Sequence, residues 1–309
     1  MSKLSTYLAL VFVTVIWGGN VVAVKILVNA FEPITITALR IFTASLVVFL
    51  VLLATKGMRK LTKQEMGAIF AAGLLNVVGH HFFLAMGLTK TTASNAGIIL
   101  GLSPLITAVL ATLFLGERFS LLKFSGIILG FIGVVFIVLH GSTAIGVISF
   151  GDISIFLSVL SQGISFILIK KMAHAIDTRL LTGGMLLSGS VVLFLISLFS
   201  EPQGLSTLKH GELLTWLVFF ASAIFATGLG HMIYNKAIHR IGATESAIFI
   251  NLTPFFSLLA SYLFLDETIH FVQIFGFVLI VVGVILASGA VADKVIKLQI
   301  RRNKVNWGQ

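Results

Sequence analysis

Apolar stretches of about 20 residues recur along the whole chain, separated by short polar breaks. Because a helix needs roughly 20 mainly apolar residues to cross the hydrocarbon core of a bilayer, each stretch predicts a membrane-spanning helix. The sequence therefore predicts an all-α, multi-pass membrane protein. The ten predicted spans cover residues 5–27, 33–54, 66–87, 92–114, 121–140, 152–170, 180–200, 212–236, 243–265 and 269–290.

Composition excludes several other classes of protein. Charged residues make up only 10% of the 309 residues, whereas soluble domains carry about 25%. The absence of cysteine excludes disulfides, thiolate nucleophiles and cysteine-bound metals. Neither an H-E-x-x-H nor a G-x-S-x-G motif occurs. We therefore expect no enzymatic activity, no cofactor and no metal site.

The distribution of Lys and Arg predicts how the helices are oriented. With the N-terminus in the cytoplasm, only Lys90 and Lys209 fall in external loops. Lys25 and Arg40 lie inside helices, and the other basic residues fall on the cytoplasmic side, where membrane proteins concentrate them. Both termini are thus predicted to be cytoplasmic, in a multi-pass protein of the cell membrane. Topology accounts for the net charge of +10, so no nucleic-acid binding is expected, although the tail could contact anionic membrane lipids.

The sequence contains an internal repeat. A shift of 150 aligns residues 81–139 with 231–289 without a gap, and 13 of these 59 positions are identical, where composition alone would give roughly five. The matched pairs are His81 with His231, Pro104 with Pro254, Glu117 with Glu267, Gly126 with Gly276, and Gly133 with Gly283. A shift of 145 extends the match weakly to the first helices, where Gly18 pairs with Gly163 and Lys25 with Lys170.

Each repeat therefore contains five helices, and an odd number of spans forces the two halves into opposite orientations. We predict a first repeat over 1–145, a second, inverted repeat over 146–290 and a basic cytoplasmic tail over 291–309. Inverted repeats are typical of secondary transporters, which bind substrate near the membrane midplane where the halves meet.

Several motifs resemble those of the drug/metabolite transporter superfamily and, within it, the EamA-type carriers. They are Trp17-Gly18, Arg40 in the second span, Ser103-Pro104 followed by Leu115-Gly116-Glu117-Arg118, and Thr253-Pro254 followed by Leu265-Asp266-Glu267. This resemblance implies a carrier that exports or exchanges small metabolites, often amino acids or related compounds, through a central cavity. A multidrug or lipid-like efflux carrier, and a channel or facilitator, are the alternatives. The substrate, the coupling ion and the choice between monomer and homodimer stay open.

Two hairpins place polar residues opposite each other in the predicted membrane. His81 and Asn95 each lie seven residues from the turn between the third and fourth spans, at a depth of about 10 Å. His231 and Glu245 are expected to face each other in the same way around Ile238. A histidine beside a carboxylate predicts a proton relay and therefore proton-coupled antiport. The alternative is an interhelical hydrogen bond with a purely structural role.

Other polar and aromatic residues form a second set of candidates for the cavity. They are Trp17, Asn20, Asn76, Gln162, Tyr234, Asn235, Ser246 and Asn251. Trp and Tyr rings could stack against a substrate, and amides could orient its polar groups, whereas helix packing is the alternative role for each. His80 is expected to bond a neighbouring helix rather than line the cavity.

Arg40 and Lys25 are predicted gate or anchor residues on the external side. Both are expected to snorkel outward. Arg40 could attract an anionic substrate or pair with Glu32, and the alternative is an anchor for the first two helices. Pro104 and Pro254 are expected to interrupt their helices, and the glycines of the fifth and tenth spans to allow close helix contact.

Overall fold

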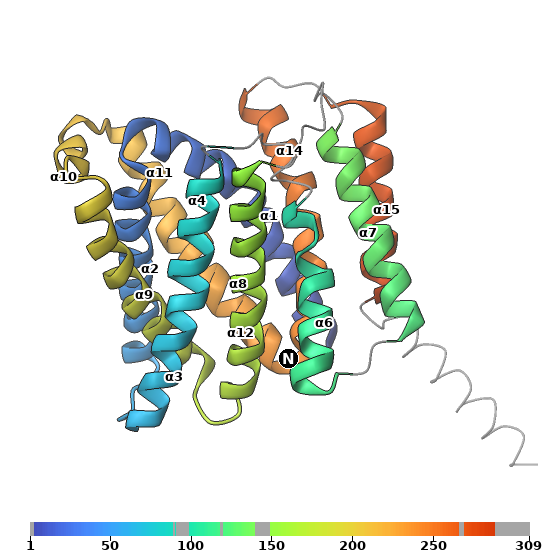
Figure 1. Cartoon of the computed structure of the whole chain (residues 1–309), viewed down its shortest axis with the longest axis horizontal. Coiled ribbons are helices and arrows are strands. Elements are labelled where there is room, and N and C mark those ends of the chain that lie inside the picture. Colours follow the sequence, from blue (N-terminus) through green and yellow to red (C-terminus); the bar gives the residue numbers. More distant parts are fainter. Residues whose placement is uncertain are drawn as a thin grey trace, which may run out of the picture.

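The computed structural model describes residues 3–88, 90, 99–117, 120–139, 149–265 and 269–287, and every regular element in these ranges is helical (Figure 1). The elements are α1 (Lys3–Ala30), α2 (Pro33–Ala54), α3 (Lys63–Gly73), η1 (Leu74–Phe82), α4 (Phe83–Leu88), α6 (Ser103–Leu115), α7 (Leu121–Leu139), α8 (Phe150–Met172), α9 (Thr178–Ser200), α10 (Gly204–Thr207), η2 (Leu208–His210), α11 (Leu213–Ala221), η3 (Ser222–Leu229), α12 (Gly230–Ile241), α13 (Ala243–Ile248), η4 (Phe249–Leu252), α14 (Thr253–Leu265) and α15 (Phe271–Ala287). Segments η1 and η3 are π-helical, whereas η2 and η4 are 3-10 turns.

Seven helices in the described ranges are long and apolar enough to cross a membrane. They are Lys3–Ala30, Pro33–Ala54, Lys63–Gly87, Phe150–Met172, Thr178–Ser200, Leu213–Ile241 and Ala243–Ala260. Ile99–Leu115, Leu121–Ile137 and Phe271–Ala287 are shorter apolar helices. The predicted all-helical, multi-pass fold class is therefore confirmed. The count of ten spans, the inverted repeat and the cytoplasmic termini stay predictions.

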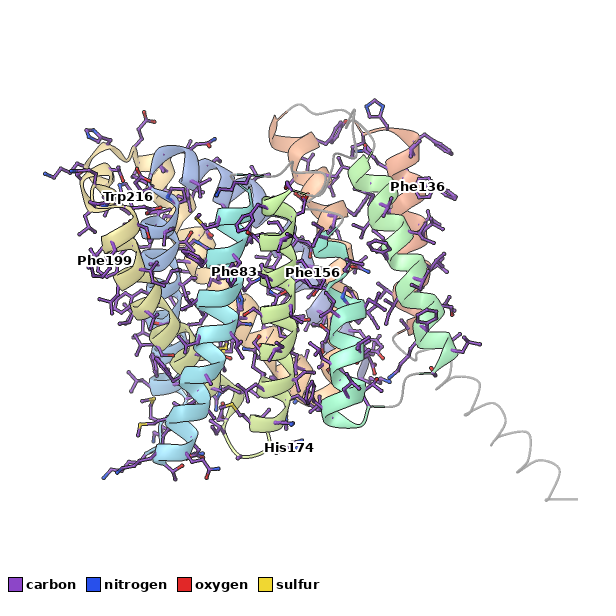
Figure 2. All side chains as sticks on the ribbon, viewed as in Figure 1. Phe83, Phe136, Phe156, His174, Phe199 and Trp216 are labelled. Carbon is purple, nitrogen blue, oxygen red and sulfur yellow. The ribbon has the colours of Figure 1, made fainter. Side chains whose placement is uncertain are left out.

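The outside of the bundle is covered by apolar side chains (Figure 2). Phe199 is 86% exposed, and Phe156 and Phe136 also project outward. Such a contiguous apolar exterior is unfavourable in water but is suited to contact with lipid chains. The helices satisfy their own backbone groups, as a hydrocarbon environment requires.

Local sequence signals start several of these helices. Thr62 and Glu65 form a reciprocal capping box at the start of α3, with hydrogen bonds of 3.2 and 2.9 Å. Ser149 and Asp152 form the same arrangement at the start of α8, and Pro33 lies in the first turn of α2. The capping boxes supply acceptors to backbone amides that have no partner within the helix, and Pro33 has no amide proton that needs one.

Pro104 and Pro254 each follow an interruption of the α-helix, as predicted. A turn at Leu102 precedes α6, and the 3-10 turn η4 precedes α14. Proline has no amide proton and its ring clashes with the carbonyl four residues earlier, so an α-helix cannot continue regularly through it.

Many helix contacts join the part of the chain before residue 145 to the part after it. α2 packs on α9, α7 on α15, α1 on α14, and α6 on α8. Figure 1 shows α7 and α15 side by side at one edge of the molecule. The interior between the pairs is filled by buried aliphatic side chains, including Leu10, Ile41, Leu181 and Ile238.

The contact between α7 and α15 is made by glycines. A Cβ atom added at Gly133 would lie 2.5 Å from the carbonyl oxygen of Gly276, and one added at Gly126 would lie 2.6 Å from that of Gly283. The two helices are therefore antiparallel and in backbone contact, which favours dispersion contacts between them. The predicted close approach at these glycines is confirmed.

Basic side chains tie connections together at the end of the bundle where the N-terminus lies (Figure 1). Arg59 donates to the carbonyl of Ala175 at 2.9 Å, and Arg179 donates to the hydroxyl of Thr55 at 2.7 Å. Arg179 also hydrogen bonds Asp177, which lowers the pKa of the Asp177 carboxyl below its ordinary value. These contacts join the 55–62 connection to the 173–177 connection.

Replacement of Gly133 by alanine is expected to lower the stability of the purified protein by roughly 1–3 kcal/mol. The new methyl group would meet the Gly276 carbonyl oxygen at 2.5 Å. Gly67→Ala on α3 is the matched control, because a Cβ there meets nothing within 4 Å and alanine is the better helix former. Thermal unfolding in detergent measures both variants. An unchanged Tm for Gly133→Ala would contradict the glycine contact.

Candidate functional site

Two π-helical segments supply many of the polar groups in the middle of the bundle. Segment η1 carries Asn76, His80 and His81, and segment η3 carries Ser222 and Thr227. The two segments occupy nearly corresponding positions when the sequence is shifted by 150. π-helical turns are rare and are found frequently at functional sites. The sequence analysis did not foresee them, because a π turn changes the hydrogen-bond pattern without a residue signature of its own.

Arg40 connects α2 to η3. Its guanidinium donates to the hydroxyl of Thr227 at 2.6 Å and to that of Ser222 at 3.4 Å. Ser222 in turn donates to the amide oxygen of Asn20 on α1 at 2.5 Å. Arg40 is only 5% exposed, so the prediction that it snorkels outward is wrong.

The predicted pairing of Arg40 with Glu32 is also wrong. Glu32 is the N-cap residue of α2, eight residues or about 12 Å from Arg40 along the helix axis. Among the described residues, no carboxylate lies within ion-pair distance of Arg40. The guanidinium is therefore held only by neutral hydroxyl groups.

An aromatic array lies beside this network. The indole N–H of Trp17 donates to the carbonyl of Ala226 in η3 at 2.9 Å. The Trp17 ring lies 5.3 Å from that of His231 and 5.1 Å from that of Tyr234, and Tyr234 lies 5.2 Å from Phe166 on α8. Tyr234 is fully buried, and its hydroxyl has no hydrogen-bond partner among the described residues.

The segment η1 makes matching contacts with α8. Asn76 donates to Ser165 at 2.8 Å, and His80 lies 2.8 Å from the hydroxyl of Ser158 and 3.2 Å from the amide nitrogen of Gln162. The prediction that His80 bonds a neighbouring helix is therefore confirmed. No group of three His, Cys, Asp or Glu residues in the described ranges is placed to hold a metal ion.

The two sets of contacts form one cluster. They meet at α8, because Gln162 lies beside His80 and Phe166 contacts the ring of Tyr234, and the rings of His80 and His81 are 4.8 Å apart. We refer to the following residues as the central polar cluster: Trp17, Asn20, Arg40, Asn76, His80, His81, Gln162, Ser222, Thr227, His231 and Tyr234. The cluster brings together seven predicted substrate-binding residues and Arg40.

The predicted pair of His231 and Glu245 does not form, which corrects that expectation. α12 continues to Ile241 and the chain turns at Gly242, which has a φ of +100°, rather than at Ile238. His231 is thus 11 residues from the turn and Glu245 only three, a difference in depth of about 12 Å. Near this turn, Ser246 donates to the carbonyl of Gly242 at 2.8 Å, and so it does not belong to the central polar cluster.

Three other candidates have different positions. Asn235 donates to Thr182 on α9 at 2.9 Å, and Asn251 is buried beside Gly130 of α7. Both therefore contact scaffold helices. Asn95 and the side chain of Lys25 lie outside the described residues.

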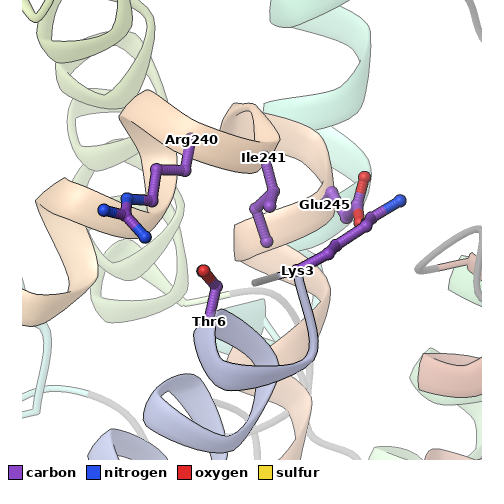
Figure 3. Close-up of a pocket in the computed structure, with 5 residues that line it drawn as sticks. All are labelled: Lys3, Thr6, Arg240, Ile241 and Glu245. Carbon is purple, nitrogen blue, oxygen red and sulfur yellow. The ribbon is translucent and has the colours of Figure 1, made fainter. Parts of the chain in front are cut away.

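Glu245 belongs to a second site, at the end of the bundle near the N-terminus (Figure 3). Its carboxylate accepts a hydrogen bond from the hydroxyl of Tyr7 and lies 3.2 Å from the ammonium of Lys3. A pocket of about 520 Å³ opens there, lined by Lys3, Thr6, Arg240, Ile241 and Glu245. Tyr7 and Lys3 were not among the predicted site residues, because no sequence pattern joins Tyr7 to a residue 238 positions away.

Replacement of Thr227 by valine is expected to destabilise the protein by about 1–3 kcal/mol, because it removes a hydroxyl that accepts from a buried charge. Thr43→Val is the matched control, since the Thr43 hydroxyl on α2 bonds only the carbonyl of Leu39 in its own helix. Thermal unfolding in detergent compares the two. Equal losses of Tm would contradict the role assigned to the contact with Arg40.

Comparison with known proteins identifies relatives over most of the chain. The sequence pattern of the EamA-like transporter family matches residues 4–139 and, again, 149–289. The chain is 30% identical over 297 residues to the uncharacterized transporter YyaM of Bacillus subtilis, an alignment that covers 94% of this chain and 96% of that protein. It is 25% identical to a WAT1-related chloroplastic protein of Arabidopsis thaliana, over 88% of this chain and 66% of that protein. One crystal structure, 19% identical in sequence, has a TM-score of 0.81 and covers 95% of this chain and 99% of its own, which shows a shared fold.

Proposed function

The chain belongs to the EamA-like transporter family and is a membrane transporter, and from this premise we propose that it is a secondary transporter of small metabolites. It moves amino acids or related compounds across the cytoplasmic membrane by alternating access, as an exporter or exchanger. The protein has ten helices in two inverted five-helix halves, and both termini lie in the cytoplasm. The two halves provide two conformations, one open to each side of the membrane.

Reciprocal glycine contacts support the inverted halves. Gly126 faces Gly283, and Gly133 faces Gly276. Under the shift of 150, Gly126 corresponds to Gly276 and Gly133 corresponds to Gly283. Exchanging each residue for its counterpart therefore turns one contact into the other. That exchange is what a two-fold axis between antiparallel helices produces. The separate family matches to the two halves of the chain also support it.

The observation that carries the proposal is the central polar cluster itself. Arg40 and Trp17 of the first half contact η3 of the second half, while Asn76 and His80 contact α8. Polar and charged groups within a membrane are costly, and in transporters they mark the substrate pathway where the repeats meet.

The site around Glu245 supports a gate at the cytoplasmic end. Lys3 and Tyr7 tie the start of α1 to α13 through Glu245, and the carboxylate of Glu117, which follows α6, accepts from the amide of Ala243 at 3.1 Å. These contacts join the two halves at one end of the bundle, so opening that end requires breaking them. We assign proton coupling to Glu245 in this gate rather than to a pair with His231.

Transport is tested by counterflow in proteoliposomes. Unlabelled substrate trapped inside should drive transient accumulation of labelled substrate from outside, because a carrier exposes its site to one side at a time. Amino acids, organic acids, drugs and lipids provide the panel, which also separates metabolite transport from multidrug or lipid efflux. Flux without transient accumulation would indicate a channel and would contradict the proposal.

Glu245→Gln is expected to remove the pH dependence of transport, because the amide cannot exchange a proton. The matched control is Glu212→Gln, at the exposed start of α11 on the opposite end of the bundle. Initial rates of counterflow are measured across a pH series for both variants. Retention of the wild-type pH profile by Glu245→Gln would overturn proton coupling at this residue.

A further inference from the structure

In the part of the chain that the structure describes, Arg40 has no counter-ion in the interior of the bundle. Within the described ranges, its guanidinium donates only to Ser222 and Thr227, although it carries five N–H donors. Buried charges in proteins are normally paired, and the cost of leaving one unpaired rises in a membrane. The side chain is nonetheless 95% buried, as its 5% exposure shows.

The packing of α2 in the bundle does not by itself require a positive charge at position 40. The shift of 145 that relates the first helices of the two halves places Met185 of α9 at the position of Arg40. Met185 is fully buried, and its carbonyl oxygen lies 2.7 Å from a Cβ added at Gly73, next to η1. The second half therefore has a neutral side chain at this position, whereas α2 packs on η3 with a charge. This difference points to a ligand rather than to the scaffold.

Among the described residues, no carboxylate lies near the cluster for a cationic ligand either. The eight acidic residues in the described ranges all lie at the ends of helices or next to them. They are Glu32, Glu65, Glu117, Asp152, Asp177, Glu201, Glu212 and Glu245. The groups around Arg40 are hydroxyls, amides and imidazoles, so the local charge is a single positive one. A monoanion neutralises that charge, while a dianion would leave an excess.

The aromatic array lies where it could contact the uncharged part of a ligand whose anionic group binds Arg40. Trp17 and His231 lie beside the residues that hold Arg40, since Thr227 also accepts from His231 through its carbonyl at 3.0 Å. Tyr234 adds a buried hydroxyl without a partner. A ligand with one anionic group and an apolar or aromatic body would therefore satisfy the charge and pack against the rings.

We propose that Arg40 binds the carboxylate of an anionic substrate and that the site prefers monocarboxylates to zwitterionic amino acids and to amines. Arginine suits this task because its planar fork accommodates both oxygens of a carboxylate. A zwitterion brings an ammonium group that no carboxylate of the cluster can neutralise. This proposal rests on the transport function proposed above and, among amino acids and related compounds, assigns the preference to related monocarboxylates rather than to amino acids.

Three ligands with the same ring test the proposal on the purified protein: 3-phenylpropanoate, L-phenylalanine and 2-phenylethylamine. Binding is measured by the fluorescence of Trp17 in a Trp216→Phe/Trp307→Phe background, and by thermal stabilisation. We expect 3-phenylpropanoate to bind roughly tenfold or more tighter than phenylalanine, with the amine weakest, as the strength of a charge-assisted contact implies. Equal or tighter binding of phenylalanine or the amine, or no binding of 3-phenylpropanoate at millimolar concentration, would overturn it.

Variants then assign the preference to Arg40. Arg40→Met copies the residue of the other half and should abolish the preference for the acid. Arg40→Lys keeps the charge and should keep the order of the three ligands with weaker binding. Arg179→Met, which changes an arginine in the first turn of α9, is the control and should bind as the unsubstituted protein does. If Arg40→Met does not fold, the ligand order in the wild type and in Arg40→Lys decides the question, and unchanged acid binding in a folded Arg40→Met contradicts the proposal.

Counterflow with the same ligands separates this inference from the proposed function. Counterflow driven by another class of compound, with no Arg40-dependent binding of acids, would reject the carboxylate site but leave the transporter intact. Arg40-dependent binding of 3-phenylpropanoate without counterflow of any ligand would support the site and reject transport.

Discussion

A hydrocarbon environment offers no water to polar groups, so each such group in a membrane protein has to find its partner within the protein or in a ligand. This constraint explains most of the polar contacts described above. Trp17 donates to a backbone carbonyl of a π segment, Asn76 pairs with Ser165, and His80 bonds two side chains of α8. Arg40 is where the constraint is least well met, because two neutral hydroxyls replace a counter-ion. The functional argument starts from that exception.

The scaffold around the cluster is more symmetric than the cluster. α7 and α15 contact each other through glycines that correspond to one another under the shift of 150. In each half, the π segment also packs on the first helix of the other half, η3 on α1 and η1 on α8. The chemistry breaks this symmetry, with Arg40 in one half and Met185 in the corresponding place of the other. Near-equal halves suit a protein that alternates between two packings, and we propose that the single charge selects the ligand.

Sequence patterns predicted the features that depend on composition and spacing. Hydropathy located the apolar helices, and proline positions predicted the helix interruptions. Glycine positions predicted that α7 and α15 each make a close helix contact but did not identify the partner. Adjacency predicted that His80 would bond a neighbouring helix. The pair of His231 and Glu245 was wrong because it assumed a turn at Ile238. The turn lies four residues later, at Gly242, which leaves the two side chains about 12 Å apart in depth. Snorkelling of Arg40 was wrong because it assumed a lipid-facing side chain. The π segments and the contact of Tyr7 with Glu245 depend on three-dimensional packing that no local pattern encodes.

The central claim is that the polar cluster lies between two halves that open alternately, and distances at the two ends test it directly. The chain has no cysteine, so pairs of spin labels can be placed cleanly at Gln64 and Lys236 near the N-terminal end, and at Lys90 and Ser206 at the opposite end. Addition of a ligand that supports counterflow, in lipid nanodiscs, should shift the two distance distributions in opposite directions. Distributions that stay unchanged at both ends, or widen together, would contradict alternating access.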